Sequence, residues 1–104
     1  MSGDYWSNLF RDGGWFNDSE GIKLVFPTSP MPSGGETGYS WFVMYKKEGC
    51  GLDDDCSYDI PSIELAADRI QAVIDHEREA AGSQNLTNIF LAGFSQGAMM
   101  TMYM

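Results

Sequence analysis

The chain has 104 residues, which is enough for one small domain spanning residues 1–104. Its 43% apolar and 13% aromatic content is typical of a chain that folds. Acidic residues outnumber basic ones by 15 to 6, so a nucleic acid or an anionic membrane surface is disfavoured as a partner. No apolar run has the length of a membrane span, and residues 1–6 lack the pattern of a signal peptide. We therefore expect a cytoplasmic protein.

Aromatic residues alternate with turn-forming residues over positions 1–21, which predicts a short helix around residues 7–11 and loops elsewhere. The aromatic side chains there need a surface on which to pack. Residues 22–26 form an apolar run that predicts a short strand, and Pro27 ends it because proline cannot donate to a ladder.

An irregular stretch rich in proline and glycine follows over residues 28–58. Trp41 and Phe42 lie in it. We expect these two side chains to pack over the edge of a sheet, and the alternative is that they line a groove that binds an acyl group.

Two cysteines, Cys50 and Cys56, flank an acidic loop. A disulfide between them would close a small loop, but free thiols are the expectation for a cytosolic chain. The loop also partly matches an EF-hand calcium site, whose ligand places would fall on Asp53, Asp55, Ser57, Asp59 and Glu64. Tyr58 stands where that motif needs glycine and no helix precedes the loop, so a solvated acidic loop without metal is the better interpretation.

A helix is predicted from residue 63 to residue 81, with Ser62 as its N-cap and Gly82 as its stop. Apolar residues at helical spacing predict its buried face: Ile63, Ala67, Ile70 and Ile74. His76 is the one histidine of the chain, and it falls on the polar face, where we expect it to be a surface residue.

The pattern G-x-S-x-G occurs at residues 93–97, with Ser95 at its centre. The apolar run at 89–92 predicts a buried parallel strand before it, and residues 98–103 predict a helix after it. This is the context in which the pattern marks a nucleophilic serine at a sharp turn from strand to helix. A parallel βαβ unit with an incomplete sheet is therefore the expected α/β fold.

The chain resembles the acyl-protein thioesterase and carboxylesterase family, also called lysophospholipase-like. The resemblance covers nearly the whole chain and lies in N-I-F-L-A-G-F-S-Q-G-A at 88–98, I-E-L-A-A-D-R-I at 63–70, I-D-H-E at 74–77, F-P-T-S-P at 26–30, S-W-F at 40–42 and S-G-D-Y-W-S-N-L-F at 2–10.

The resemblance implies a partial α/β-hydrolase fold that cleaves acyl esters or thioesters of small molecules or lipidated proteins through an acyl-serine intermediate. Ser95 would be the nucleophile and the backbone N–H of Gln96 one donor to the oxyanion. Trp41 and Phe42 would contact the substrate if they line the groove. No cofactor and no metal is expected.

The sequence departs from the family pattern because it ends at Met104, before any later aspartate or histidine could complete a triad. The first strands and the loop with the second oxyanion donor are also missing. One interpretation is a piece of an esterase or thioesterase. The other is an inactive, hydrolase-derived subunit that binds proteins. Either way, we expect a partner chain or an oligomer to cover its exposed sheet edges.

Overall fold

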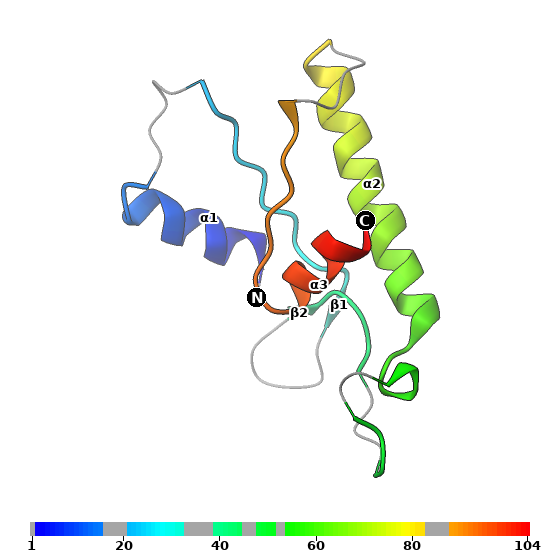
Figure 1. Cartoon of the computed structure of the whole chain (residues 1–104). Coiled ribbons are helices and arrows are strands. Elements are labelled where there is room, and N and C mark those ends of the chain that lie inside the picture. Colours follow the sequence, from blue (N-terminus) through cyan, green and yellow to red (C-terminus); the bar gives the residue numbers. More distant parts are fainter. Residues whose placement is uncertain (1, 16–20, 33–38, 45–47, 52–53, 83–87) are drawn as a thin grey trace. The chain divides into compact units, whose positions relative to one another are not determined.

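The computed structural model describes residues 2–15, 21–32, 39–44, 48–51, 54–82 and 88–104. Its elements are, in order, α1 (Gly3–Asp12), β1 (Met31–Pro32), β2 (Tyr39–Ser40), the short 3-10 helix η2 (Asp55–Ser57), α2 (Ile60–Ala80) and α3 (Gln96–Tyr103) (Figure 1). The chain divides into two compact units, Met1–Ser40 and Trp41–Met104, which are described separately. The prediction of a single domain over residues 1–104 stays a prediction.

In the first unit, α1 begins at Gly3, four residues before the predicted start at residue 7, because capping groups are available there. The hydroxyl of Ser2 accepts from the backbone N–H of Tyr5, and Asp4 lies in the first turn, where a negative charge is favourable. Gly3 donates its N–H to the Thr28 hydroxyl over 2.9 Å, and a Cβ on Gly3 would collide with the backbone of Phe26. Helix α1 is thereby joined to the stretch around residues 26–28.

The aromatic side chains of the first unit pack on one another. The ring of Phe10 on α1 lies 5.3 Å from that of Phe26 and 5.6 Å from that of Trp15, and Tyr5 meets Trp6 edge to face at 5.5 Å. These spacings are in the range of favourable ring pairs. The prediction that these aromatic residues find a packing surface is therefore confirmed in part: Phe10 packs on Phe26, whereas Trp15 stays 71% and Tyr5 50% exposed, and Phe16 lies outside the described residues.

The predicted strands at 22–26 and 89–92 are wrong. Both stretches run as extended coil (cyan and orange in Figure 1), without a ladder to any neighbour among the described residues. The sheet that is described is a two-stranded antiparallel pair, in which Met31 faces Ser40 and Pro32 faces Tyr39. An apolar run becomes a strand only where a neighbour satisfies its backbone groups, so the α/β fold is shown only in part.

The second unit is built on α2, which begins at Ile60, three residues before the predicted start. Asp59, and not Ser62, is its N-cap: the Asp59 carboxylate accepts from the N–H of Ser62 over 3.0 Å. Pro61 fits inside the first turn because its missing N–H would have no helical partner there. Gly82 follows the helix with φ 66°, the left-handed conformation expected of its stop.

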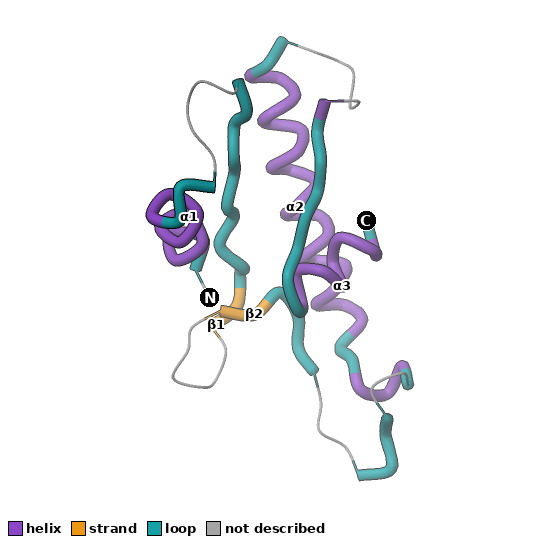
Figure 2. Tube along the Cα trace, turned by 60° about the vertical axis from the view of Figure 1, so that its left-hand side comes forward, coloured by secondary structure: helices purple, strands orange, loops and turns teal. Residues whose placement is uncertain are grey.

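Helix α3 packs on α2 in the second unit, and the two helices lie side by side in Figures 1 and 2. Among the described residues of the second unit, the fully buried apolar side chains are Phe42, Ala66 on α2 and Met100 on α3. The predicted stripe of α2, which is Ile63, Ala67, Ile70 and Ile74, is half-buried. The buried face is therefore centred one position away, on Ser62 and Ala66.

Ser62 joins α2 to the chain segment at residues 41–44. Its buried hydroxyl donates to the Asp59 carbonyl over 2.7 Å and accepts from the Val43 N–H over 3.0 Å. The Val43 carbonyl in turn accepts from the Asp59 N–H over 3.0 Å, and Met44 pairs with Tyr58 in an isolated antiparallel bridge. The segment at 41–44 is thus held by the start of α2.

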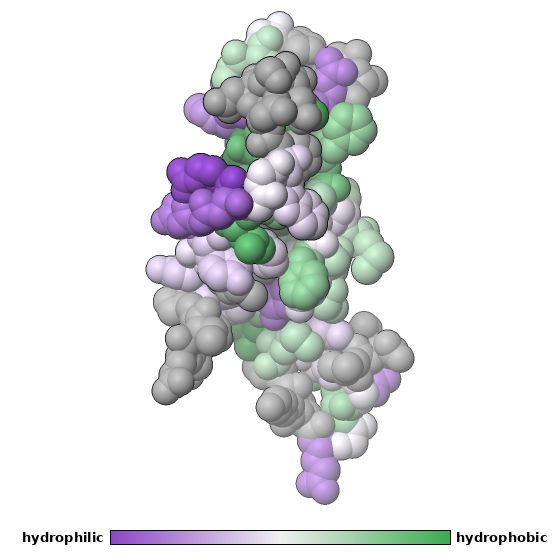
Figure 3. All heavy atoms as spheres, turned by 90° about the vertical axis from the view of Figure 1, so that its left-hand side faces the viewer, coloured by the Kyte–Doolittle hydropathy of each residue, from purple (hydrophilic) through white to green (hydrophobic). Residues whose placement is uncertain are grey.

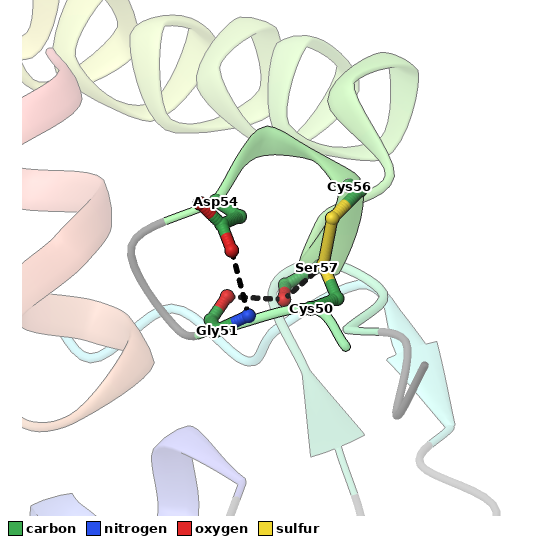
Figure 4. The surroundings of a disulfide bond; sticks show 5 residues. All are labelled: Cys50, Gly51, Asp54, Cys56 and Ser57. Carbon is green, nitrogen blue, oxygen red and sulfur yellow. Dashed lines mark hydrogen bonds between the residues drawn. A yellow bond between two sulfur atoms is a disulfide. The ribbon is translucent and has the colours of Figure 1, made fainter. Parts of the chain in front are cut away.

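Cys50 and Cys56 form a disulfide, so the expectation of free thiols is wrong (Figure 4). The loop that the disulfide closes has its own hydrogen bonds. The buried Ser57 hydroxyl donates to the Gly51 carbonyl over 2.6 Å, and the Gly51 N–H donates to the Asp54 carboxylate over 2.8 Å. The turn into η2 brings the two cysteines together, a proximity that their spacing allowed but did not require.

We expect Ser62→Ala to lower the free energy of unfolding by about 1–3 kcal/mol, because the part-buried N–H of Val43 loses its acceptor. Asp68→Ala, at an exposed position of the same helix, is the matched control and should change it by less than about 0.5 kcal/mol. Urea unfolding followed by circular dichroism measures both. Equal effects of the two substitutions would contradict the role given to Ser62.

Candidate active site

Ser95 lies at the bend between the extended stretch at 89–94 and α3. It is the N-cap of α3 with φ 55° and ψ -122°, and it is the one non-glycine residue with positive φ in the described chain. Such a sparsely populated conformation costs a serine about 1–3 kcal/mol, and residues in conformations of this kind cluster at functional sites. The sharp turn into a helix predicted from the G-x-S-x-G pattern is therefore present, although no paired strand precedes it.

The hydroxyl of Ser95 is available for chemistry. An N-cap serine normally accepts from the first turn of its helix, but Ser95 makes no side-chain cap hydrogen bond and is exposed. Its backbone carbonyl accepts instead from Ala98 at 3.0 Å and from Met99 at 3.2 Å. The turn is thus closed by main-chain atoms while the Oγ remains accessible.

Gly93 makes this bend sterically feasible. A Cβ on Gly93 would collide with the backbone of Gly97 and would lie 2.5 Å from the nitrogen of Ala98. Gly97 has no such constraint, because a Cβ there would lie 3.7 Å from Nε1 of Trp41, an ordinary contact. The two glycines of the pattern therefore have different roles, which the spacing of the motif did not predict.

The start of α3 supplies N–H groups beside Ser95. Gly97 donates to the Phe94 carbonyl over 2.9 Å, and Ala98 and Met99 donate to Ser95. Within the described part of the chain, the N–H of Gln96 donates to no backbone carbonyl. The first N–H groups of a helix favour negative charge, so Gln96 is placed where an oxyanion donor would be needed.

The side chain of Gln96 holds two neighbouring peptide groups of the 41–44 segment. Its Oε1 accepts from the N–H of Trp41 over 2.9 Å, and its Nε2 donates to the carbonyl of Phe42 over 3.2 Å. Sequence reasoning assigned Gln96 a role for its backbone alone. The available signal was a long polar side chain at the start of an otherwise apolar helix.

Trp41 and Phe42 have different environments. Phe42 is 2% exposed and packs against Tyr58, with ring centres 6.0 Å apart. It lines a small apolar pocket of about 130 Å³ together with Tyr58, Ile63, Met99, Met100 and Tyr103. Trp41 is half-buried and approaches Gly97 with its indole. Of the two predicted substrate contacts, Trp41 is thus the one that lies beside the bend and reaches the surface.

His76 is exposed on α2, as expected of a surface histidine. The described residues at the bend itself, 93–97, contain no histidine and no carboxylate. The site therefore brings together a serine hydroxyl and a helix N-terminus, while the group that would take the serine proton is not found among these residues.

The acidic loop uses several of its polar groups locally. Of the five places in the calcium pattern, Asp53 lies outside the described residues, Ser57 donates to Gly51, and Asp59 caps α2. Ligand atoms of Cys50, Asp54 and Cys56 lie within 4.8 Å of one another, but both sulfurs are engaged in the disulfide. A disulfide sulfur is not a thiolate, so this cluster lacks the usual cysteine ligands.

Comparison with known proteins decides the family. A family model described as phospholipase/carboxylesterase matches residues 2–104. The chain belongs to the phospholipase/carboxylesterase family. No curated protein and no solved structure matches it. The family consists of α/β-hydrolases of the esterase and phospholipase type, so the predicted resemblance to carboxylesterases is confirmed.

The assignment of Ser95 and Gln96 as site residues stays a prediction. The finer assignment to acyl-protein thioesterases stays a prediction. None of the helices described here combines the length and the apolar character that crossing a bilayer requires.

We expect Gly93→Ala to destabilise this carboxylesterase-family chain by about 3 kcal/mol or more, since the new methyl group has no space against the backbone of Gly97. Gly97→Ala should change stability by no more than about 1 kcal/mol, because alanine favours the helix and its contact with Trp41 is ordinary. Thermal unfolding by circular dichroism compares them. The assignment fails if Gly97→Ala is the more damaging of the two.

Proposed function

We propose that this chain carries the nucleophile of a serine hydrolase that cleaves acyl esters or thioesters. Ser95 is the nucleophile and the N–H of Gln96 is one donor to the oxyanion. The observation that carries the proposal is the conformation of Ser95, which is held at φ 55° with an exposed, uncapped hydroxyl at the start of a helix. Membership of the phospholipase/carboxylesterase family supports the same reaction class.

The reaction would follow the usual course of acyl transfer. The Oγ of Ser95 attacks the carbonyl carbon while a base takes its proton, and the carbonyl oxygen becomes an oxyanion near the N–H of Gln96. Collapse breaks the bond to the leaving oxygen or sulfur, which receives the proton. Water then attacks the acyl-serine by the same steps, which releases the acid and restores Ser95.

The base is the part of the machinery that the described site lacks. The chain has one histidine, His76, and it lies exposed on the scaffold helix α2. We therefore assign the base to a histidine outside these 104 residues, oriented by a carboxylate, as in serine hydrolases generally. Serine without a base is a weak nucleophile at neutral pH, so the activity of Ser95 depends on that histidine.

Labelling with a fluorophosphonate probe tests the assignment, because the probe reacts with an activated serine. We call the protein as its own cells produce it the source protein, in contrast to a recombinant chain of residues 1–104. In the source protein, the tryptic peptide that begins at Glu79 and contains Ser95 should carry the mass of the phosphonate. Recombinant chain of residues 1–104 should label no more than its Ser95→Ala variant, since the loss of a triad member costs several orders of magnitude in rate.

His76→Ala in the source protein is the control and should leave labelling unchanged. Two results would refute the proposal. One is a source protein whose Ser95 peptide is detected only in unmodified form. The other is a recombinant chain that labels at Ser95 and loses the label on His76→Ala, since His76 would then be the base.

A second candidate function, protein binding without catalysis, is favoured by apolar exposure on the last segment of the chain. Phe90 is 88% and Met102 is 82% exposed. On the face drawn in Figure 3, apolar residues (green) reach the surface between polar ones (purple). Phe94 and Tyr103 of the same segment are also exposed, at 70% and 54%. Several exposed apolar side chains that gather in one patch are typical of surfaces that contact another chain. A hydrolase-derived subunit could bind its partner through them.

We expect the recombinant chain to associate at micromolar concentration, because these side chains gain free energy when they are covered. Light scattering coupled to size-exclusion chromatography measures the mass. The paired substitution Phe90→Ser and Met102→Ser should shift the chain toward monomer, whereas Trp15→Ser, at a 71% exposed position of the first unit, should not. A monodisperse wild-type monomer would count against this candidate.

A further inference from the structure

We propose that Gln96 is a positioning residue, whose carboxamide holds Trp41 beside Ser95 so that the indole forms one wall of the acyl-binding site. The proposal rests on the function proposed for Ser95. It goes beyond it because it gives the side chain of Gln96 a task separate from its backbone N–H, and it names the residue that contacts the acyl group.

The geometry of the carboxamide is the first argument. Its oxygen accepts from Trp41 N–H at 2.9 Å and its nitrogen donates to Phe42 carbonyl at 3.2 Å, so one planar group satisfies two successive residues of the segment. The orientation of the carboxamide is determined by these partners, because an N–H requires an acceptor and a carbonyl requires a donor. Both bonds are partly buried, where an unpaired polar group is costly.

The second argument is the position of the two rings on the held segment. Phe42 is anchored in the interior of the second unit against Tyr58. Trp41 remains half-buried, and its indole nitrogen lies 3.7 Å from where a Cβ on Gly97 would stand, two residues after the nucleophile. A half-exposed indole at this place offers a flat apolar surface to an acyl chain on Ser95.

The third argument is that, among the described residues, no strand pairs with residues 41–43. The N–H of Trp41 and the carbonyl of Phe42 are satisfied by Gln96, while Val43 is satisfied by Asp59 and Ser62. Removal of the carboxamide would therefore release Trp41 from the bend while the attachment of Val43 to α2 persists.

We call the two hydrogen bonds from the Gln96 carboxamide to Trp41 and Phe42 the clamp. Hydrogen exchange at the amide of Trp41 tests the clamp without reference to catalysis. Gln96→Met keeps the length of the side chain and removes both hydrogen bonds, so exchange should accelerate about tenfold. Gln96→Glu keeps an acceptor for Trp41 but loses the donor to Phe42, so its effect should be smaller. Gln71→Met, which removes an exposed carboxamide bound only to Asp75, is the matched control. Equal exchange in wild type and Gln96→Met would overturn the clamp.

Steady-state kinetics of the source protein test whether the Trp41 indole contacts the acyl chain. The two substrates are p-nitrophenyl octanoate and p-nitrophenyl acetate. Gln96→Met and Trp41→Ala should each raise KM for the octanoate about fivefold, and should raise KM for the acetate by a clearly smaller factor because its acyl group is too short to contact the indole. Gln71→Met, on the exposed face of α2, is the variant that should leave the hydrolysis of both esters unchanged. The double variant should show no further rise, because both substitutions remove one contact. A merely structural effect would lower kcat for both esters. That result, or additive effects of the two substitutions on KM, would overturn the proposal that Trp41 contacts the acyl chain.

The two tests separate the two proposals. If the wild-type protein hydrolyses neither ester but the amide of Trp41 still depends on Gln96, then the proposed function fails and the clamp stands. If Ser95 is active and KM for the octanoate is the same in wild type, Gln96→Met and Trp41→Ala, then the proposed function stands and the positioning role of Gln96 fails.

Discussion

The arrangement of the second unit depends on how the backbone polar groups of residues 41–44 are satisfied. A buried N–H or carbonyl without a partner costs as much as a lost hydrogen bond, and this segment has neither a helix nor a ladder for most of its groups. Gln96 at the start of α3 bonds Trp41 and Phe42, while Asp59 and Ser62 at the start of α2 bond Val43. Two helix N-termini are thereby joined through one irregular stretch.

Hydrogen bonds and close packing also explain why Ser95 keeps an unfavourable backbone conformation. The bend is closed by main-chain bonds from Gly97, Ala98 and Met99, and the absent side chain of Gly93 lets the incoming chain lie against the helix. Because α3 is also anchored by Gln96 and by the buried Met100, the bend cannot relax without the loss of several contacts. Backbone strain at a residue persists when its surroundings hold it in this way.

Local patterns allowed part of this arrangement to be predicted. The helix at 60–80, its glycine stop and the bend at Ser95 follow from spacing, capping chemistry and the tight packing that Gly93 permits, all of which are read within a few residues. The strands at 22–26 and 89–92 could not be predicted correctly, because a ladder depends on neighbours that are distant in sequence. The contacts of the Gln96 side chain and the burial of Phe42 were missed for the same reason, since their partners lie more than fifty residues apart in the chain or across the core.

The disulfide between Cys50 and Cys56 bears on where such a chain could be made. It spans a sequence separation of 6, so it restrains only a short loop of the unfolded chain and contributes about 2 kcal/mol of stability through chain entropy. The hydrogen bonds of Ser57 and Asp54 hold the same turn. The hydrogen bonds of Gln96 and Ser62 to residues 41–43 do not depend on the disulfide. In a reducing environment these hydrogen bonds would therefore still hold the loop and the helix packing, while only the crosslink would be lost.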